Sequence, residues 1–165
     1  MLRHAKSSWG NDSLADRDRP LAERGHHDAR RMDDYLRANE LRPDLVLCSP
    51  ARRTRETLEL VAGAVAGAET TIEAALYGAE APEILAVLHT IEPAHGCVMI
   101  IGHNPGLEDL VMDLAGDGDP TAMDQLRTKF PTAALAVLDL GETGWPQLAP
   151  GSGYLARLVL PRHLH

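Results

Sequence analysis

The sequence has no long apolar run that could cross a membrane. All of its uncharged stretches are shorter than the roughly 18 residues that a transmembrane helix needs. The charged start, Arg3 to Lys6, also lacks the apolar core of a secretory signal. We therefore expect a cytoplasmic protein that does not enter membranes.

Positive charge is scarce. The chain has 16 Lys and Arg residues against 24 Asp and Glu, which gives a net charge of −8. General nucleic-acid binding needs clustered cations that replace counterions along the phosphate backbone. The composition argues against that class of partner, and any phosphate site here must be a local island of positive charge.

Cysteine is nearly absent as well. The two cysteines, Cys48 and Cys97, adjoin predicted buried strands, where a free thiol usually behaves as a small apolar side chain. A cysteine phosphatase requires an arginine six positions after its cysteine, and Thr54 occupies that position after Cys48. That class of phosphatase is excluded by the spacing.

Metal-binding and nucleotide-binding motifs are missing too. No His-Glu-x-x-His, paired Cys-x-x-Cys, Gly-x-x-x-x-Gly-Lys or strand-linked Gly-x-Gly-x-x-Gly pattern occurs. His26 and His27 are adjacent, so they face different directions on a helix and make a poor metal pair. We expect an enzyme that uses neither metal nor cofactor.

Helical and apolar patterns alternate along the chain. Apolar spacing predicts helices over 20–39, 54–66, 82–91 and 105–114. Compact apolar runs predict strands at 45–48, 71–74, 97–101, 133–140 and 155–160, while 115–131 is ambiguous. This order predicts one α/β domain over 1–165, a three-layer α/β/α sandwich with a mostly parallel central sheet and a late antiparallel strand pair at its edge.

Three chemically distinctive turns lie at or near the ends of predicted strands. Arg3-His4 opens the chain, Ser49 to Arg53 follows one apolar run, and Gly102-His103 follows another. Sites in such sheets form beyond the carboxyl ends of the strands, so the turns plausibly share one rim. Two imidazoles and two guanidiniums gathered there would suit a phosphoryl group, because arginine binds phosphate oxygens bidentately and a neutral imidazole can attack phosphorus.

These turns together resemble the histidine phosphatase superfamily, over essentially the whole chain. The pattern consists of Arg-His near the start, Ser-x-x-x-Arg-x-x-Glu-Thr from Ser49 to Thr57, and Gly102-His103. The run from Leu2 to Trp9, the run from Arg19 to Gly25 and the turn from Gly102 to Pro105 look like the SixA-type phosphohistidine phosphatases. Glu56 replaces the glutamine usual in the family.

The resemblance implies roles for particular residues. His4 would be the phosphate-accepting nucleophile, Arg3 and Arg53 would hold the phosphoryl oxygens, and His103 would complete the pocket. Ser7 and Asn104 are lesser candidates for lining it. Superfamily mutases and ester phosphatases place an acidic proton donor in mid-chain, where Glu80 and Glu83 are possible candidates.

The chain departs from the family pattern at its start. Family members usually carry a short apolar strand before the Arg-His pair, and here only Met1 and Leu2 precede it. We therefore expect the first strand to be truncated.

The missing proton donor favours one substrate class. Phosphohistidine leaves as imidazole, a better leaving group than an alkoxide, so protonation of the leaving atom matters less. The sequence predicts a phosphohistidine phosphatase that acts on a phosphorylated signalling protein as a monomer. The alternatives are a phosphatase of small phosphate esters and, in another class, a non-catalytic module that recognises phosphate.

Overall fold

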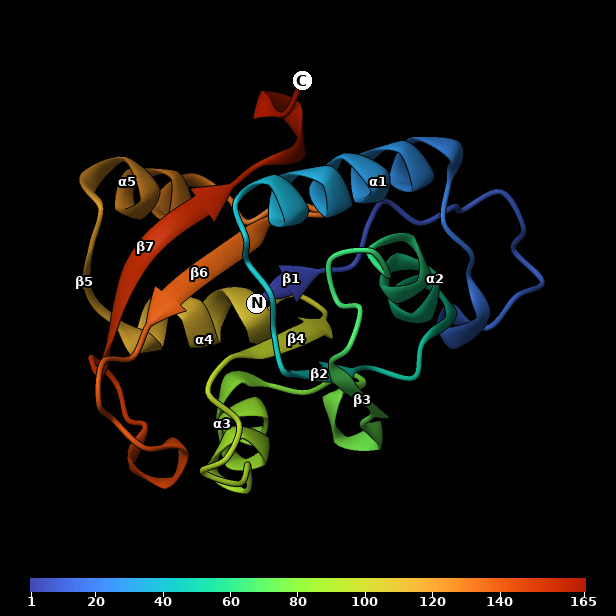
Figure 1. Ribbon diagram of the computed structural model, residues 1–165. Helices are drawn as coiled ribbons and strands as arrows, with labels where there is room; N and C mark the ends of the chain where they lie inside the picture. The colour runs from blue at the N-terminus through green and yellow to red at the C-terminus, as the bar shows by residue number, and fades with distance from the viewer.

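A seven-stranded mixed sheet forms the centre of the protein, which a computed structural model describes over residues 1–165 (Figure 1). The strands are β1 (Leu2–Arg3), β2 (Leu45–Cys48), β3 (Glu69–Ile72), β4 (Val98–Gly102), β5 (Ala115–Gly118), β6 (Leu135–Asp139) and β7 (Gly153–Val159). Their spatial order is β3-β2-β4-β1-β6-β7-β5. Strands β2, β4 and β1 are therefore parallel neighbours, with the shortest strand near the middle.

Five helices cover both faces of this sheet. They are α1 (Glu23–Ala38), α2 (Arg52–Leu60), α3 (Ala81–His89), α4 (Gly106–Leu114) and α5 (Pro120–Thr128). On one face, Met32 and Leu36 of α1 pack with Val46 of β2. On the other face, α3, α4 and α5 pack their apolar stripes against residues such as Ile100 of β4. The predicted three-layer sandwich is confirmed.

The late strand pair is antiparallel, as predicted, but it does not form the edge of the sheet. β6 pairs antiparallel with both β1 and β7, and β5 then adds to the far side of β7 in parallel. β5 and α5 arise from the ambiguous segment. Asp119 accepts a hydrogen bond from the N–H of Ala122 at 2.9 Å, so Pro120 opens a capped helix there.

The first strand is short but central. Leu2 is fully buried, and it pairs with Ile101 of β4 on one side and Leu135 of β6 on the other. The amino group of Met1 donates a hydrogen bond to the carbonyl oxygen of Ala136 at 2.7 Å. Burial lowers the pKa of this amino group to about 5. This end of the chain is therefore built into the sheet.

Two sequence predictions need correction. The helix predicted over 54–66 begins at Arg52 and ends at Leu60. It ends early because Asp33 of α1 accepts the N–H of Ala64 at 2.7 Å and stabilises a turn after the helix. Cys48 is buried as predicted, but Cys97 is exposed because it precedes β4 instead of lying inside it. Among the helices, none is both long and apolar enough to cross a bilayer.

Candidate active site

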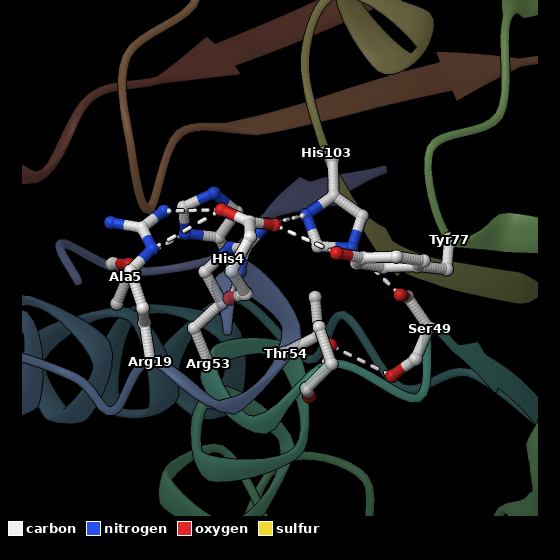
Figure 2. A network of polar contacts seen from close by, with 10 residues as sticks. His4, Ala5, Arg19, Ser49, Arg53, Thr54, Tyr77 and His103 are labelled. Atoms are coloured by element: carbon white, nitrogen blue, oxygen red, sulfur yellow. Dashed lines mark hydrogen bonds and ion pairs between the residues drawn. The ribbon is translucent and has the colours of Figure 1, made fainter. Parts of the chain in front are cut away.

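The carboxyl ends of three adjacent strands bring the predicted residues together (Figure 2). His4 follows β1, Ser49 follows β2 and His103 follows β4. The registers Leu2 with Ile101 and Cys48 with Ile101 align the three strand ends at one rim. As a result, the His4 and His103 rings lie with their centroids 5.3 Å apart at an interplanar angle of 52°.

His4 is held as a neutral imidazole with one free nitrogen. Its Nδ1 lies 2.7 Å from the carbonyl oxygen of Ala5, which can only accept, so Nδ1 carries the hydrogen and Nε2 carries the lone pair. Burial, helped by the neighbouring His103, Arg53 and Arg3, lowers the pKa of His4 to about 3 against the opposing hydrogen bond to Ala5. An unprotonated Nε2 is the form a nucleophile requires.

His103 is fixed in the opposite tautomer. Arg53 donates from Nη2 to Nδ1 of His103 across 3.3 Å, and an arginine can only donate. Nε2 of His103 therefore carries the hydrogen and donates to the Ser49 hydroxyl at 2.7 Å. Burial and the charge of Arg53 lower the pKa of His103 to about 4. The two histidines thus hold opposite neutral tautomers.

The two predicted guanidiniums retain unused hydrogen-bonding capacity. The Nε atoms of Arg3 and Arg53 are buried without a hydrogen-bond partner in the protein, an arrangement that normally costs free energy. Burial lowers the pKa of Arg3, and the charge of Arg53 acts in the same direction against the attraction of Glu108. An anion placed between the guanidiniums would stabilise both.

The start of α2 is fastened to the loops on either side of it. The Thr57 hydroxyl accepts the N–H of Ala5 at 3.0 Å and donates to the Arg53 carbonyl at 2.6 Å. The Glu56 carboxylate accepts the N–H of Leu21 at 2.7 Å. The Glu56-Thr57 pair therefore holds the segment after His4 against the helix that carries Arg53.

Asn104 and Ser7 have other partners than a phosphoryl group. The amide of Asn104 donates to Glu108 at 2.7 Å and to the Phe130 carbonyl at 2.9 Å, so both of its N–H donors are used. Arg3 donates to the same carbonyl at 2.9 Å. Ser7 is buried, and its backbone forms a bridge with Leu21. Asn104 therefore supports the loops around the site, whereas the role of the Ser7 hydroxyl in lining the pocket stays a prediction.

The two mid-chain glutamates lie at the start of α3. The N–H of Glu80 donates to the Glu83 carboxylate at 2.8 Å, as part of a cap, and both residues are exposed. Neither is among the contacts of the two imidazoles. Glu83 thus has a structural partner that the sequence analysis did not foresee.

Sequence reasoning missed an acidic residue that joins the site. Asp16 accepts a hydrogen bond from Arg53 Nη2 at 3.1 Å, and its backbone carbonyl accepts another from Arg53 Nη1 at 2.7 Å. The Tyr77 hydroxyl donates to the Asp16 carboxylate at 2.8 Å, and the Tyr77 ring meets His103 edge-on. Arg19 binds the other carboxylate oxygen.

The arrangement suits nucleophilic phosphoryl transfer. It provides an unprotonated imidazole, two guanidiniums with free donors and a second imidazole within one buried cluster. No group of three or more His, Cys, Asp and Glu side chains gathers as metal ligands. Burial raises the pKa of the Cys48 thiol to about 12, so this residue is a poor nucleophile.

Known proteins share this fold and sequence. Residues 1–80 match the model of the histidine phosphatase superfamily, branch 1. An uncharacterized Mycobacterium tuberculosis protein, Rv1276c, is 34% identical over 169 residues, covering 98% of this chain and 100% of that one. The SixA protein of Agrobacterium tumefaciens is 30% identical, with a TM-score of 0.82 over 97% of this chain and 95% of the other.

A second solved structure agrees with the first. The SixA protein of Nakamurella multipartitia is 30% identical and has a TM-score of 0.84, covering 98% of this chain and 94% of that one. The fold of this chain agrees with both solved structures over nearly its whole length. The chain belongs to branch 1 of the histidine phosphatase superfamily, as a phosphatase of the SixA type.

Proposed function

We propose that this phosphatase hydrolyses phosphohistidine on a protein, with His4 as the nucleophile. Nε2 of His4 attacks phosphorus, the bond to the substrate nitrogen breaks, and water then releases phosphate from His4. Arg3 and Arg53 hold the phosphoryl oxygens through donors that the protein leaves unused. The solved structures named for SixA support this substrate class.

His103 would change its protonation state when substrate binds. In the structure it is neutral, with a pKa near 4, and its Nδ1 accepts from Arg53. A phosphoryl dianion beside the ring favours the charged form and raises that pKa. Nδ1 of His103 would then donate to a phosphoryl oxygen. The positive charge on the ring would form only beside the negative charge of the bound phosphoryl group.

The acidic side chains around the site lack a proton donor for the leaving group, and this favours phosphohistidine as the substrate. Hydrogen bonding from Tyr77, followed by the charge and hydrogen bond of Arg53, lowers the pKa of Asp16, so this carboxyl is ionised at neutral pH. Glu83 accepts a backbone N–H at the start of α3. An alkoxide leaving group needs a proton from such a group, whereas an imidazole does not.

A comparison of substrates tests the proposal. Purified protein is given a phosphohistidine peptide, a phosphoserine peptide and glucose 6-phosphate, and kcat/KM is measured for each. We expect the phosphohistidine peptide to be cleaved fastest, with activity abolished in His4→Ala and retained in the matched surface variant His26→Ala. Faster cleavage of glucose 6-phosphate would show that the protein is an ester phosphatase.

The cytoplasmic location and monomeric state stay predictions.

A further inference from the structure

Asp16 is a fixed carboxylate at the solvent side of the phosphoryl pocket. Its side chain is 54% exposed, whereas the Arg53 side chain that it binds is 8% exposed. Three residues donate to its two oxygens, namely Arg53, Tyr77 and Arg19. Arg53, Tyr77 and Arg19 are all drawn around the two histidines in Figure 2. The geometry holds a negative charge on the solvent side of the cluster formed by Arg53, His103 and His4.

Asp16 and the phosphoryl site share a single nitrogen. Arg53 Nη2 lies 3.1 Å from the Asp16 carboxylate and 3.3 Å from Nδ1 of His103. His4 lies deeper, with 7% of its surface exposed. A phosphoryl group between His4 and Arg53 must direct the rest of its substrate toward solvent. Asp16 binds the same guanidinium and is more exposed than His4, so its carboxylate is placed to meet a leaving group that points to solvent on this side.

We propose that Asp16 contacts the substrate and determines specificity, because its carboxylate accepts a hydrogen bond from the free ring N–H of a departing phosphohistidine imidazole. This inference rests on the proposed function and names a residue for it. The hydroxyl of Tyr77 and the guanidinium of Arg19 hold the carboxylate in position. Arg19 in turn stacks on Trp9, with its guanidinium carbon 3.5 Å from the ring centroid.

The carboxylate assists the reaction without giving up or taking a proton. In phosphohistidine one ring nitrogen bears phosphorus, and the other is protonated. His4 Nε2 forms a bond to phosphorus while the bond from phosphorus to the substrate nitrogen breaks, and the electron pair of that bond stays on the ring. The proton remains on the other nitrogen, so a neutral imidazole leaves. An adjacent carboxylate favours the protonated ring, which is the better leaving group.

The same charge disfavours other substrates. An alkyl phosphate releases an alkoxide, and an ionised carboxylate cannot supply the proton that this step needs. A sugar acid phosphate brings a second negative charge to the pocket mouth, where Asp16 repels it. One residue thus favours the phosphoramidate and opposes the anionic ester.

Two charge-matched variants test the role of Asp16. Asp16→Asn keeps the shape and removes the charge, and Asp18→Asn removes an equal charge from the same short helical turn, where the side chain is exposed. The three substrates are a phosphohistidine peptide, 3-phosphoglycerate and p-nitrophenyl phosphate, and the leaving group of the last needs no proton. Inorganic phosphate inhibition reports the pocket itself, and thermal melting reports folding.

We expect Asp16→Asn to lower kcat/KM for the phosphohistidine peptide by about 10- to 100-fold, the effect of losing a hydrogen bond to a charged group. Hydrolysis of p-nitrophenyl phosphate should change by less than about 3-fold, and cleavage of 3-phosphoglycerate should rise. Asp18→Asn should leave all three rates as in the wild type.

The outcomes separate this inference from the proposed function. Equal losses on the phosphohistidine peptide and p-nitrophenyl phosphate, together with weaker phosphate inhibition, mean that Asp16 only positions Arg53, and they overturn the inference. In that case the wild-type preference for phosphohistidine still stands. If the wild type itself prefers esters, the proposed function fails first and this inference fails with it.

Discussion

Arg53 donates a hydrogen bond from Nη2 to Nδ1 of His103, although Arg53 lies in the first turn of α2 and His103 follows β4. This contact fixes the tautomer of His103 and directs its Nε2–H to Ser49. The guanidinium also binds Asp16, so a single side chain connects the second imidazole with the mouth of the pocket. The geometry of Arg53 therefore matters as much as its charge.

Arg53→Lys should lower kcat about 100-fold or more, because an ammonium cannot reproduce a planar fork that binds several partners at once. The fold should survive, since the charge is kept. Steady-state kinetics with p-nitrophenyl phosphate measures the effect. Arg55→Lys, at an exposed position of the same helix, is the matched control and should retain full activity. An Arg53→Lys enzyme with near-normal kcat would contradict this assignment.

Thr57→Val should impair both stability and activity. The substitution keeps the shape of the side chain but leaves the buried N–H of Ala5 without its acceptor, at a cost of about 1–3 kcal/mol. Because Ala5 follows His4, the nucleophile should also lose its alignment. Denaturant unfolding and kcat measure the two effects. Thr128→Val, at an exposed hydroxyl bonded to a helix carbonyl, should change stability by less than about 0.5 kcal/mol.

The protein should lose stability as pH falls below about 6.5. Burial depresses the folded-state pKa of His4 to about 3 and of His103 to about 4, while the pKa of an unperturbed histidine is about 6.5. Between these values the unfolded state binds the protons and the folded state does not. At pH 5 each histidine should therefore cost about 2 kcal/mol relative to pH 7.5.

Urea unfolding at pH 7.5, 6 and 5 measures this loss. The double variant His4→Gln, His103→Gln should show a flatter dependence of unfolding free energy on pH than the wild type. The variant His27→Gln changes an exposed ring and should keep the wild-type slope. Equal slopes in the wild type and the double variant would show that the site histidines titrate normally.

Gly25→Ala should destabilise the protein, although alanine is the better helix former. A Cβ atom at this position of α1 would lie 2.2 Å from the carbonyl oxygen of Lys6. That carbonyl also accepts the N–H of Ala22 at 2.8 Å, so the segment after His4 cannot move away freely. We expect a loss of about 1–3 kcal/mol in unfolding free energy. A stabilised variant would show that helix propensity outweighs this contact.

Two central strands of the sheet could be predicted because they are buried on both faces. The apolar runs that became β2 and β4 were recognisable, and so were the chemically distinctive residues at their ends. The segment from Ala115 to Thr128 could not be assigned. Its strand, β5, has two exposed residues and gains its pairing only from β7, so no local pattern marks it.

The candidate site, like the sheet, could be predicted only in part. His4, His103, Arg3 and Arg53 could be predicted to share one rim because they stand at or near strand ends. Asp16 could not be predicted as a site residue, because it lies in a charged turn whose residues are not buried. Its importance arises from contacts with Tyr77 and Arg53, which lie far away in sequence.

The central claim is that Nε2 of His4 takes the phosphoryl group from the substrate. Rapid mixing with a phosphohistidine peptide, quenching in alkali and tandem mass spectrometry measure it directly, because phosphohistidine survives alkali. We expect a transient phosphoryl group on His4 that forms and decays at rates compatible with turnover and is absent from His4→Asn. Turnover by His4→Asn at the wild-type rate, or a phosphoryl group trapped on a different residue, would contradict it.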